Sequence, residues 1–324
     1  MSLADRYTMK RYAFLLKYFF ALGCVAWFLW RTDLSLVAIG FQKLSLMTIV
    51  CILLINVLSL AVNSEKWRLL LPDTSFRTLF ATNLAGQFYA TVFPGQLAGD
   101  SIKTYILGSA QKQVDTVAAS VVVDKLTGLV GGVFILGFFG GLLSKEHFAH
   151  IALVVFGVGF FVFLCIFSLI RHSLTMNWLR SHIQSIASRY PKSEKYIRFA
   201  LSILDTTRRY SESPWILVKS VCMGILYQLL GIVIIVLLTR DIGVSVGFFD
   251  WTWIVALLSV VLLVPITVAG LGLREGTLIG VTSLLGVPAH LALTVSLSLF
   301  GLQVCTAAFG GVVELNRIYK IHTS

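Results

Sequence analysis

Residues 93–100 read FPGQLAGD and residues 264–276 read VPITVAGLGLREG, and each stretch interrupts a long apolar segment. Both contain Pro-x-x-x-Ala-Gly, 171 residues apart, and both then place ionisable residues within apolar sequence. Proline and glycine interrupt regular helices, so each segment is predicted to turn near its middle. These two breaks decide the fold, because they make two bent segments out of what would otherwise be long straight helices.

The composition is that of a membrane protein. The chain has 324 residues, 57% of them hydrophobic and 13% charged, with a mean hydropathy of +0.87. A soluble chain carries about 25% charged residues, so an all-α, polytopic integral membrane protein is predicted. The net charge of +11 would suit nucleic acid, but the basic residues flank apolar runs, as membrane-topology signals do. No nucleic-acid partner is therefore expected.

The apolar runs predict about six spanning helices and two re-entrant hairpins. The spans are expected at 12–30, 46–64, 115–143, 150–170, 215–239 and 288–312. The two broken segments, 80–108 and 251–287, are too long for one span and too short for two, since a span needs about 20 residues. They are predicted to be helical hairpins that enter and leave on the same side; the alternative is an eight-helix protein.

The distribution of basic residues predicts the orientation. With a cytoplasmic N-terminus, nineteen of the 26 Lys and Arg fall in cytoplasmic loops and four in outer loops. Both termini are then cytoplasmic, in a bacterial or archaeal cytoplasmic (inner) membrane, and the hairpins enter from opposite sides. The chain is read as one transmembrane domain, 1–324, with repeats 12–143 and 150–312 in inverted topology, an arrangement typical of transporters with a midplane site. The basic cytoplasmic linker 171–214 is expected to be either an amphipathic helix on the inner leaflet or a solvated connection.

Ionisable residues inside spans cost about 2.5–3.5 kcal/mol each and are candidates for function. They are Asp100, Lys103, Asp124, Lys125, Arg274 and Glu275. Because adjacent residues on a helix do not face each other, pairs between elements are predicted. The expected pairs are Asp100 or Asp124 with Arg274, and Lys103 or Lys125 with Glu275. Such pairs would bind substrate or gate the site; the alternative is an architectural lock.

The breaks themselves predict a pocket for an anion. The residues concerned are Pro94, Gly95, Gly99, Pro265, Gly270 and Gly272. Glycine allows positive φ and close approach, and a helix that starts after a break presents free N–H groups to an anion such as phosphate. The alternative is that the glycines only permit tight packing. Uncharged polar residues on the same elements favour a wet cavity; they are Asn56, Ser59, Asn63, Asn83, Gln87, Tyr89, Thr91, Gln96, Gln228, Thr267 and Gln303.

Signatures of catalysis and of metal binding are missing from the sequence. The five cysteines form no Cys-x-x-Cys, and the six histidines do not cluster as zinc ligands would. No Walker loop, Gly-x-Ser-x-Gly or His-Glu-x-x-His occurs. Neither a cofactor nor a metal is expected, and the chain is not expected to be an enzyme.

Four motifs in order carry a family resemblance. They are KWRLLL at 66–71, Pro94 to Lys103, VVVDKL at 121–126, and Pro265 to Glu275. Together they resemble the flippase-like family named after the transmembrane region of lysylphosphatidylglycerol synthase, with Asp124-Lys125 where that family is expected to have Glu-Arg. The resemblance implies a membrane domain that moves a lipid head group between leaflets, here as a stand-alone member without the aminoacyl-transferase domain.

The expected function is therefore that of a lipid flippase. Its substrate would be an anionic lipid or a polyprenyl-phosphate-linked precursor, bound in the cavity and moved across the membrane. The alternative is a membrane-embedded transferase or an accessory subunit in envelope lipid or glycan synthesis. Envelope-biosynthesis enzymes are the expected protein partners, and the sequence gives no indication of the oligomeric state.

Overall fold

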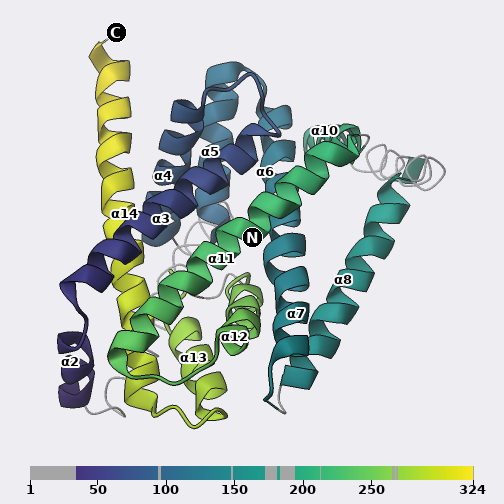
Figure 1. Cartoon of the computed structure of the whole chain (residues 1–324). Coiled ribbons are helices and arrows are strands. Elements are labelled where there is room, and N and C mark those ends of the chain that lie inside the picture. The colour runs from purple at the N-terminus through teal and green to yellow at the C-terminus, as the bar shows by residue number, and fades with distance from the viewer. Residues whose placement is uncertain are drawn as a thin grey trace, which may run out of the picture.

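The computed structural model of the chain is all-helical in the part that it describes. That part comprises residues 34–93, 96–146, 149–171, 181–182, 194–211, 213–264, 267 and 269–323. Every regular element within it is a helix, so the predicted all-α class is confirmed (Figure 1). The predicted first span, 12–30, lies outside the described residues.

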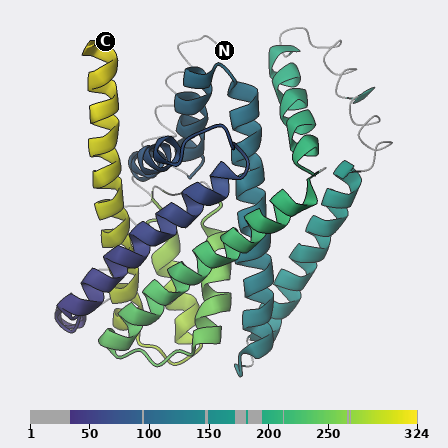
Figure 2. The ribbon, with the colours of Figure 1, turned by 45° about the horizontal axis from the view of Figure 1, so that its top comes forward.

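Long apolar helices match the other predicted spans. Within the described ranges, four helical stretches are long and apolar enough to cross a membrane, and a further apolar helix, α8 (Ala149–Arg171), matches the predicted 150–170. The four are α3 (Leu46–Arg68), the α6–α7 stretch (Val114–Leu143), α11 (Pro214–Ile242) and α14 (Ala289–Thr323). The chain is therefore a multi-pass membrane protein. α3 and α11 lie side by side and run diagonally across the bundle, with the short α2 (Leu34–Gln42) beyond the start of α3 (Figures 1 and 2).

Both broken segments fold as pairs of short helices. The first is α4 (Phe76–Val92) with α5 (Gln96–Gln111), and the second is α12 (Phe248–Val261) with α13 (Leu273–Ser283). At 1.5 Å per residue, the 14 residues of α12 reach about 21 Å, short of the roughly 30 Å hydrocarbon core. α12 alone is therefore too short to cross the membrane. The hairpins lie at opposite ends of the bundle with their tips toward its middle (Figures 1 and 2).

The first helix of the first hairpin, α4, is packed tightly between α14 and α5. A Cβ atom on Gly310 of α14 would overlap the carbonyl oxygen of Leu84 on α4. A Cβ on Gly99 of α5 would lie 2.5 Å from the carbonyl oxygen of Gly86 on α4. Because both contacts are with backbone, these glycines set how closely α4 approaches α14 and α5.

The third span, predicted as a continuous helix, changes geometry at its centre. α6 (Val114–Gly128) passes into a seven-residue π-helix, η1 (Leu129–Ile135), before α7 (Leu136–Leu143). Gly131 lies in this π segment, and a Cβ there would come within 2.5 Å of the Val221 carbonyl oxygen of α11. π-Helical turns are rare and often occur at functional sites, and this one borders the cavity described below.

The linker contains a helix that packs against the bundle. α10 (Glu194–Ser211) lies against α6, and the Ser202 hydroxyl donates to the Asp115 carboxylate at 2.8 Å. The Tyr210 hydroxyl donates to the Leu70 carbonyl oxygen at 2.8 Å. A helix was one of the two alternatives expected for this linker, and its contacts show that α10 also packs against the protein.

Candidate functional site

A cavity of about 370 Å³ lies between the two hairpins. Its wall is formed by residues of α3, α4, α5, α6, η1, α11, α12, α13 and α14, together with the turn after α12. Ligand sites in proteins commonly measure about 300–1,000 Å³, so the cavity can accept a phosphate-bearing head group. Of the predicted polar residues, five line it: Asn63, Gln87, Gln228, Thr267 and Gln303.

The cavity brings together charged residues from four helices. Its cations are Lys66, Lys103, Lys125 and Arg274, and its carboxylates are Asp100 and Asp124. Gly99 and Gly270, predicted from the two breaks, also line it. Positive charge exceeds negative charge on the wall, and a narrow site with such an excess attracts anions.

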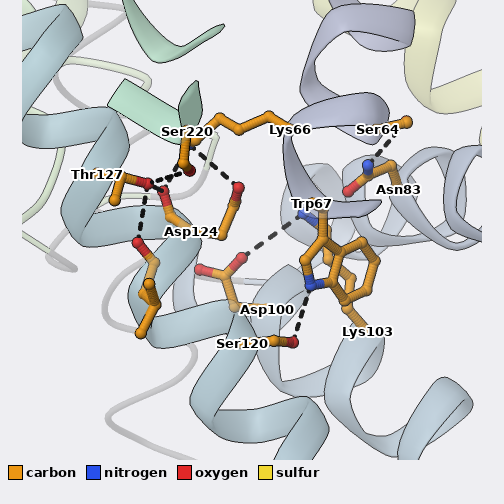
Figure 3. A network of polar contacts seen from close by, with 11 residues as sticks. Ser64, Lys66, Trp67, Asn83, Asp100, Lys103, Ser120, Asp124, Thr127 and Ser220 are labelled. Atoms are coloured by element: carbon orange, nitrogen blue, oxygen red, sulfur yellow. Dashed lines mark hydrogen bonds and ion pairs between the residues drawn. The ribbon is translucent and has the colours of Figure 1, made fainter. Parts of the chain in front are cut away.

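Asp100 of α5 is the acid with the most cations around it. Its Oδ2 contacts the Lys125 ammonium of α6. Its Oδ1 lies 3.8 Å from the Lys103 Nζ, one helical turn along α5 (Figure 3). Lys103 is held independently of this carboxylate. Its side chain lies against Gly86, where a Cβ would be 2.5 Å from the Lys103 Cε, and its Nζ lies 5.7 Å from the centre of the Trp67 ring.

Asp124 is paired with a residue that the sequence reasoning missed, Lys66 of α3. The Lys66 Nζ lies 3.1 Å from the Asp124 Oδ1 and donates to the Asp124 carbonyl oxygen at 2.5 Å (Figure 3). Gly128 makes room for this ammonium, since a Cβ there would lie 3.0 Å from it. Lys66 was counted as a cytoplasmic loop residue, although its place in the KWRLLL motif was a signal that could have identified it.

The residue after Lys66 fixes the same helix pair. The indole N–H of Trp67 donates to the Ser120 hydroxyl at 2.9 Å, and Ser120 lies one turn before Asp124 on α6 (Figure 3). The indole and the ammonium thus attach the end of α3 to two successive turns of α6. The ammonium is positioned by this attachment, because its neighbour Trp67 is 2% exposed and cannot move without opening the core.

Arg274 carries the charge of the second hairpin and is buried among polar partners. Its Nε donates to the Ser296 hydroxyl at 3.2 Å and its Nη1 to the Gln303 amide oxygen at 3.1 Å. Its Nη2 donates to the Glu275 carboxylate at 3.5 Å, and Glu275 is fully buried. Glu275 supports Arg274 from behind and does not line the cavity.

The predicted pairing of the charged residues is wrong. The pairs across the hairpins do not form: Asp100 contacts Lys103 and Lys125, Asp124 contacts Lys66, and Arg274 contacts the adjacent Glu275. Adjacent residues can meet here because Glu275 bends back to accept the Gly272 N–H at 2.6 Å.

The backbone pocket for an anion is not supported at α13 for the same reason. The Gly272 N–H, which was predicted to be available to an anion, is occupied by the Glu275 carboxylate. Gly270 and Gly272 have the expected positive φ values of 78° and 86°, whereas Gly99 lies within α5 and serves close packing. The side chains therefore provide the positive charge at the second hairpin. Pro94, Gly95 and Pro265 lie outside the described residues.

Possible metal ligands are scattered in the part of the chain that the structure describes. Among the described residues, no group of three or more His, Cys, Asp or Glu is placed to hold a metal ion. The acids of the cavity are instead each matched with lysine, which leaves salt bridges and an excess of cations as its chemistry.

This fold and cavity define a polytopic, all-helical membrane protein with a cationic internal site. Residues 14–310 match the family described as the lysylphosphatidylglycerol synthase TM region, and the chain belongs to this family. Membership places the protein among membrane proteins of lipid or envelope biosynthesis. No curated protein and no solved structure matches the chain.

Proposed function

We propose that this protein is a flippase that binds an anionic lipid head group and moves it between the leaflets of the cytoplasmic membrane. The observation that supports this most is the cavity between the hairpin tips, whose wall carries more cations than carboxylates. A phosphate-bearing lipid or a polyprenyl-phosphate-linked precursor has the matching charge. The excess of Lys and Arg in the predicted cytoplasmic loops favours an orientation with both termini inside.

The two short hairpins suggest how such a site could face either side. Because they lie at opposite ends of the bundle with their tips toward the middle, a shift of one against the other would open the cavity to one leaflet at a time (Figure 2). In this proposal the inverted repeat supplies two equivalent gates around one head-group site.

Leaflet distribution in proteoliposomes tests the proposal. Phosphatidylglycerol with a fluorescent label on one acyl chain is placed in both leaflets. Dithionite, added outside, then destroys the fluorescence of the label in the outer leaflet. The protein should make the inner label accessible faster than protein-free vesicles do, and should leave labelled phosphatidylcholine, which has no net charge, at the protein-free rate. Binding without redistribution would instead identify an accessory subunit that holds lipid for an enzyme.

A further inference from the structure

Asp100 already occupies the place that an incoming anion needs. Its two carboxylate oxygens face Lys125 and Lys103, one each, on the wall of the cavity. A phosphate group that enters this side of the cavity would approach the same two ammonium groups. The protein therefore contains an internal anion that competes with its proposed substrate.

The other ion pairs of the cavity are not exchangeable in this way. Lys66, whose side chain is 4% exposed, is held by both the carboxylate and the carbonyl oxygen of Asp124. Arg274 is fixed by neutral partners on α14 as well as by Glu275. In the Asp100 cluster one acid serves two lysines, and the Lys125 side chain is 32% exposed.

We propose that Asp100 takes up a proton when a phosphate group binds, so that anion binding and proton binding are linked. This rests on the proposed function and adds a coupling ion to it. Two anions cannot share the two lysines without repulsion, whereas a neutral carboxyl group removes the repulsion and can donate its O–H to a phosphate oxygen. Lys103 keeps its place, because Gly86 and Trp67 hold it.

The remaining charged and titratable groups on the wall do not replace Asp100 in this role. They are Lys66, Lys103, Asp124, Lys125, Tyr227 and Arg274. Asp124 keeps its own ammonium partner, Lys66. From α4, which packs on α5, Tyr89 donates to Glu314 of α14 at 3.1 Å. Asp100 is the acid that loses its partners to the phosphate.

The direction of the pH dependence follows from linkage. If the bound state holds one more proton than the free state, affinity increases as pH falls, by up to about tenfold per pH unit. Each anion that crosses the membrane would then carry a proton with it, and a proton gradient could drive accumulation of lipid in one leaflet.

Calorimetric titration of the purified full chain tests the linkage. The probe is dioctanoyl phosphatidylglycerol, whose phosphodiester keeps one negative charge from mildly acidic to neutral pH. Titrations in buffers of different ionisation enthalpy should show uptake of about one proton per lipid in the wild type. Asp100→Asn should show none, and should bind at neutral pH at least as tightly as the wild type does at mildly acidic pH. The control is Asp73→Asn, at an exposed turn, which should keep the proton uptake of the wild type.

Each outcome decides one point. Binding by the wild type without proton uptake, or uptake retained in Asp100→Asn, overturns the linkage and leaves the proposed function standing. No binding to either protein at any pH contradicts the proposed function itself. Equal affinity for dimethyl phosphate, which lacks acyl chains, would assign the site to a free phosphate ester. If Asp100→Asn does not fold, infrared difference spectra of the wild type decide, since lipid must convert a carboxylate into a protonated carboxyl group.

Discussion

The two hairpins contain the same break but use their charged residues in different ways. In the first hairpin, Asp100 and Lys103 face the cavity, and Asp100 also contacts a lysine of a different span, Lys125. In the second, Arg274 and Glu275 meet each other and are held by hydroxyl and amide groups of α14. The repeated motif therefore determines the backbone turn, while the neighbouring helix determines whether the charges are exchangeable or fixed.

α14 also links the two hairpins. Gln303 accepts from the Arg274 guanidinium at 3.1 Å, and its amide N–H donates to the Thr91 hydroxyl of α4 at 3.4 Å. A movement of the second hairpin would thus be transmitted to the first hairpin through the Gln303 side chain. The fixed hairpin and the exchangeable one are parts of one polar chain across the cavity.

The largest expected effect on the free energy of unfolding comes from removing the buried carboxylate of the second hairpin. Glu275→Leu leaves the Arg274 guanidinium buried without its anion, which should lower the free energy of unfolding by about 3–5 kcal/mol. Chemical unfolding in detergent micelles measures it. The double variant Arg274→Met with Glu275→Leu is the control and should recover most of the loss. A loss below about 1 kcal/mol for the single variant would contradict a fixed, buried pair.

The next largest loss of stability is expected when the ion pair between α3 and α6 is removed. Lys66→Met strands an Asp124 side chain that is 18% exposed, so we expect a loss of about 2–3 kcal/mol, less than for a fully buried pair. Arg68→Met, two residues away, removes an exposed pair with Glu65 and should change stability by less than about 0.5 kcal/mol. Equal losses for the two variants would show that Lys66 is not held as described.

Packing of the two hairpins can be compared with one substitution in each. Gly99→Ala puts a methyl group 2.5 Å from the Gly86 carbonyl oxygen and should cost about 1–2 kcal/mol by separating α4 from α5. Gly280→Ala on α13 meets nothing within 4 Å and should stabilise the helix by about 0.5–1 kcal/mol. Thermal unfolding of the two variants should therefore shift in opposite directions.

The smallest effect on stability is expected at the exchangeable cluster. Lys125→Met leaves Asp100 with Lys103 and should change the free energy of unfolding by less than about 1 kcal/mol. It should nevertheless weaken dioctanoyl phosphatidylglycerol binding at least about tenfold, since a hydrogen bond to a charged group contributes roughly 1.5–3 kcal/mol. Lys145→Met, at an exposed loop away from the cavity, is the control and should leave binding unchanged. Unchanged binding by Lys125→Met would remove this cluster from the site.

Much of the fold was predictable, because its signals are local. Apolar length predicted the described spans, and proline with glycine predicted where the two hairpins turn. The π segment at Leu129–Ile135 was not predictable, since its sequence, LVGGVFI, is equally compatible with an α-helix. Its geometry depends on contacts with α11 that are distant in the sequence.

For the site, the sequence could predict which charged residues gather but not how they pair. Intramembrane charge alone identified Asp100, Asp124, Lys125 and Arg274, and the structure brings them to one cavity. The partners depend on helix rotation and on side-chain reach. Lys66 shows this best. It lies at the end of a span in the sequence, yet its ammonium reaches Asp124 of α6, because Gly128 has no side chain to block it.

The π segment also makes the length of the third span matter in a way that its hydrophobicity does not. A turn closed by i→i+5 bonds holds one residue more than an α-helical turn, and each residue of an α-helix rotates the chain by about 100°. The π segment therefore accommodates one extra residue, and deleting one residue between 129 and 135 would restore an α-helix and leave α7 facing nearly the same way. Gly137 and Gly140, which let Phe156 of α8 and Trp253 of α12 approach, would keep their places. A single-residue deletion in an α-helical part of this span would instead rotate the residues beyond it by about 100° and turn these glycines away from their partners.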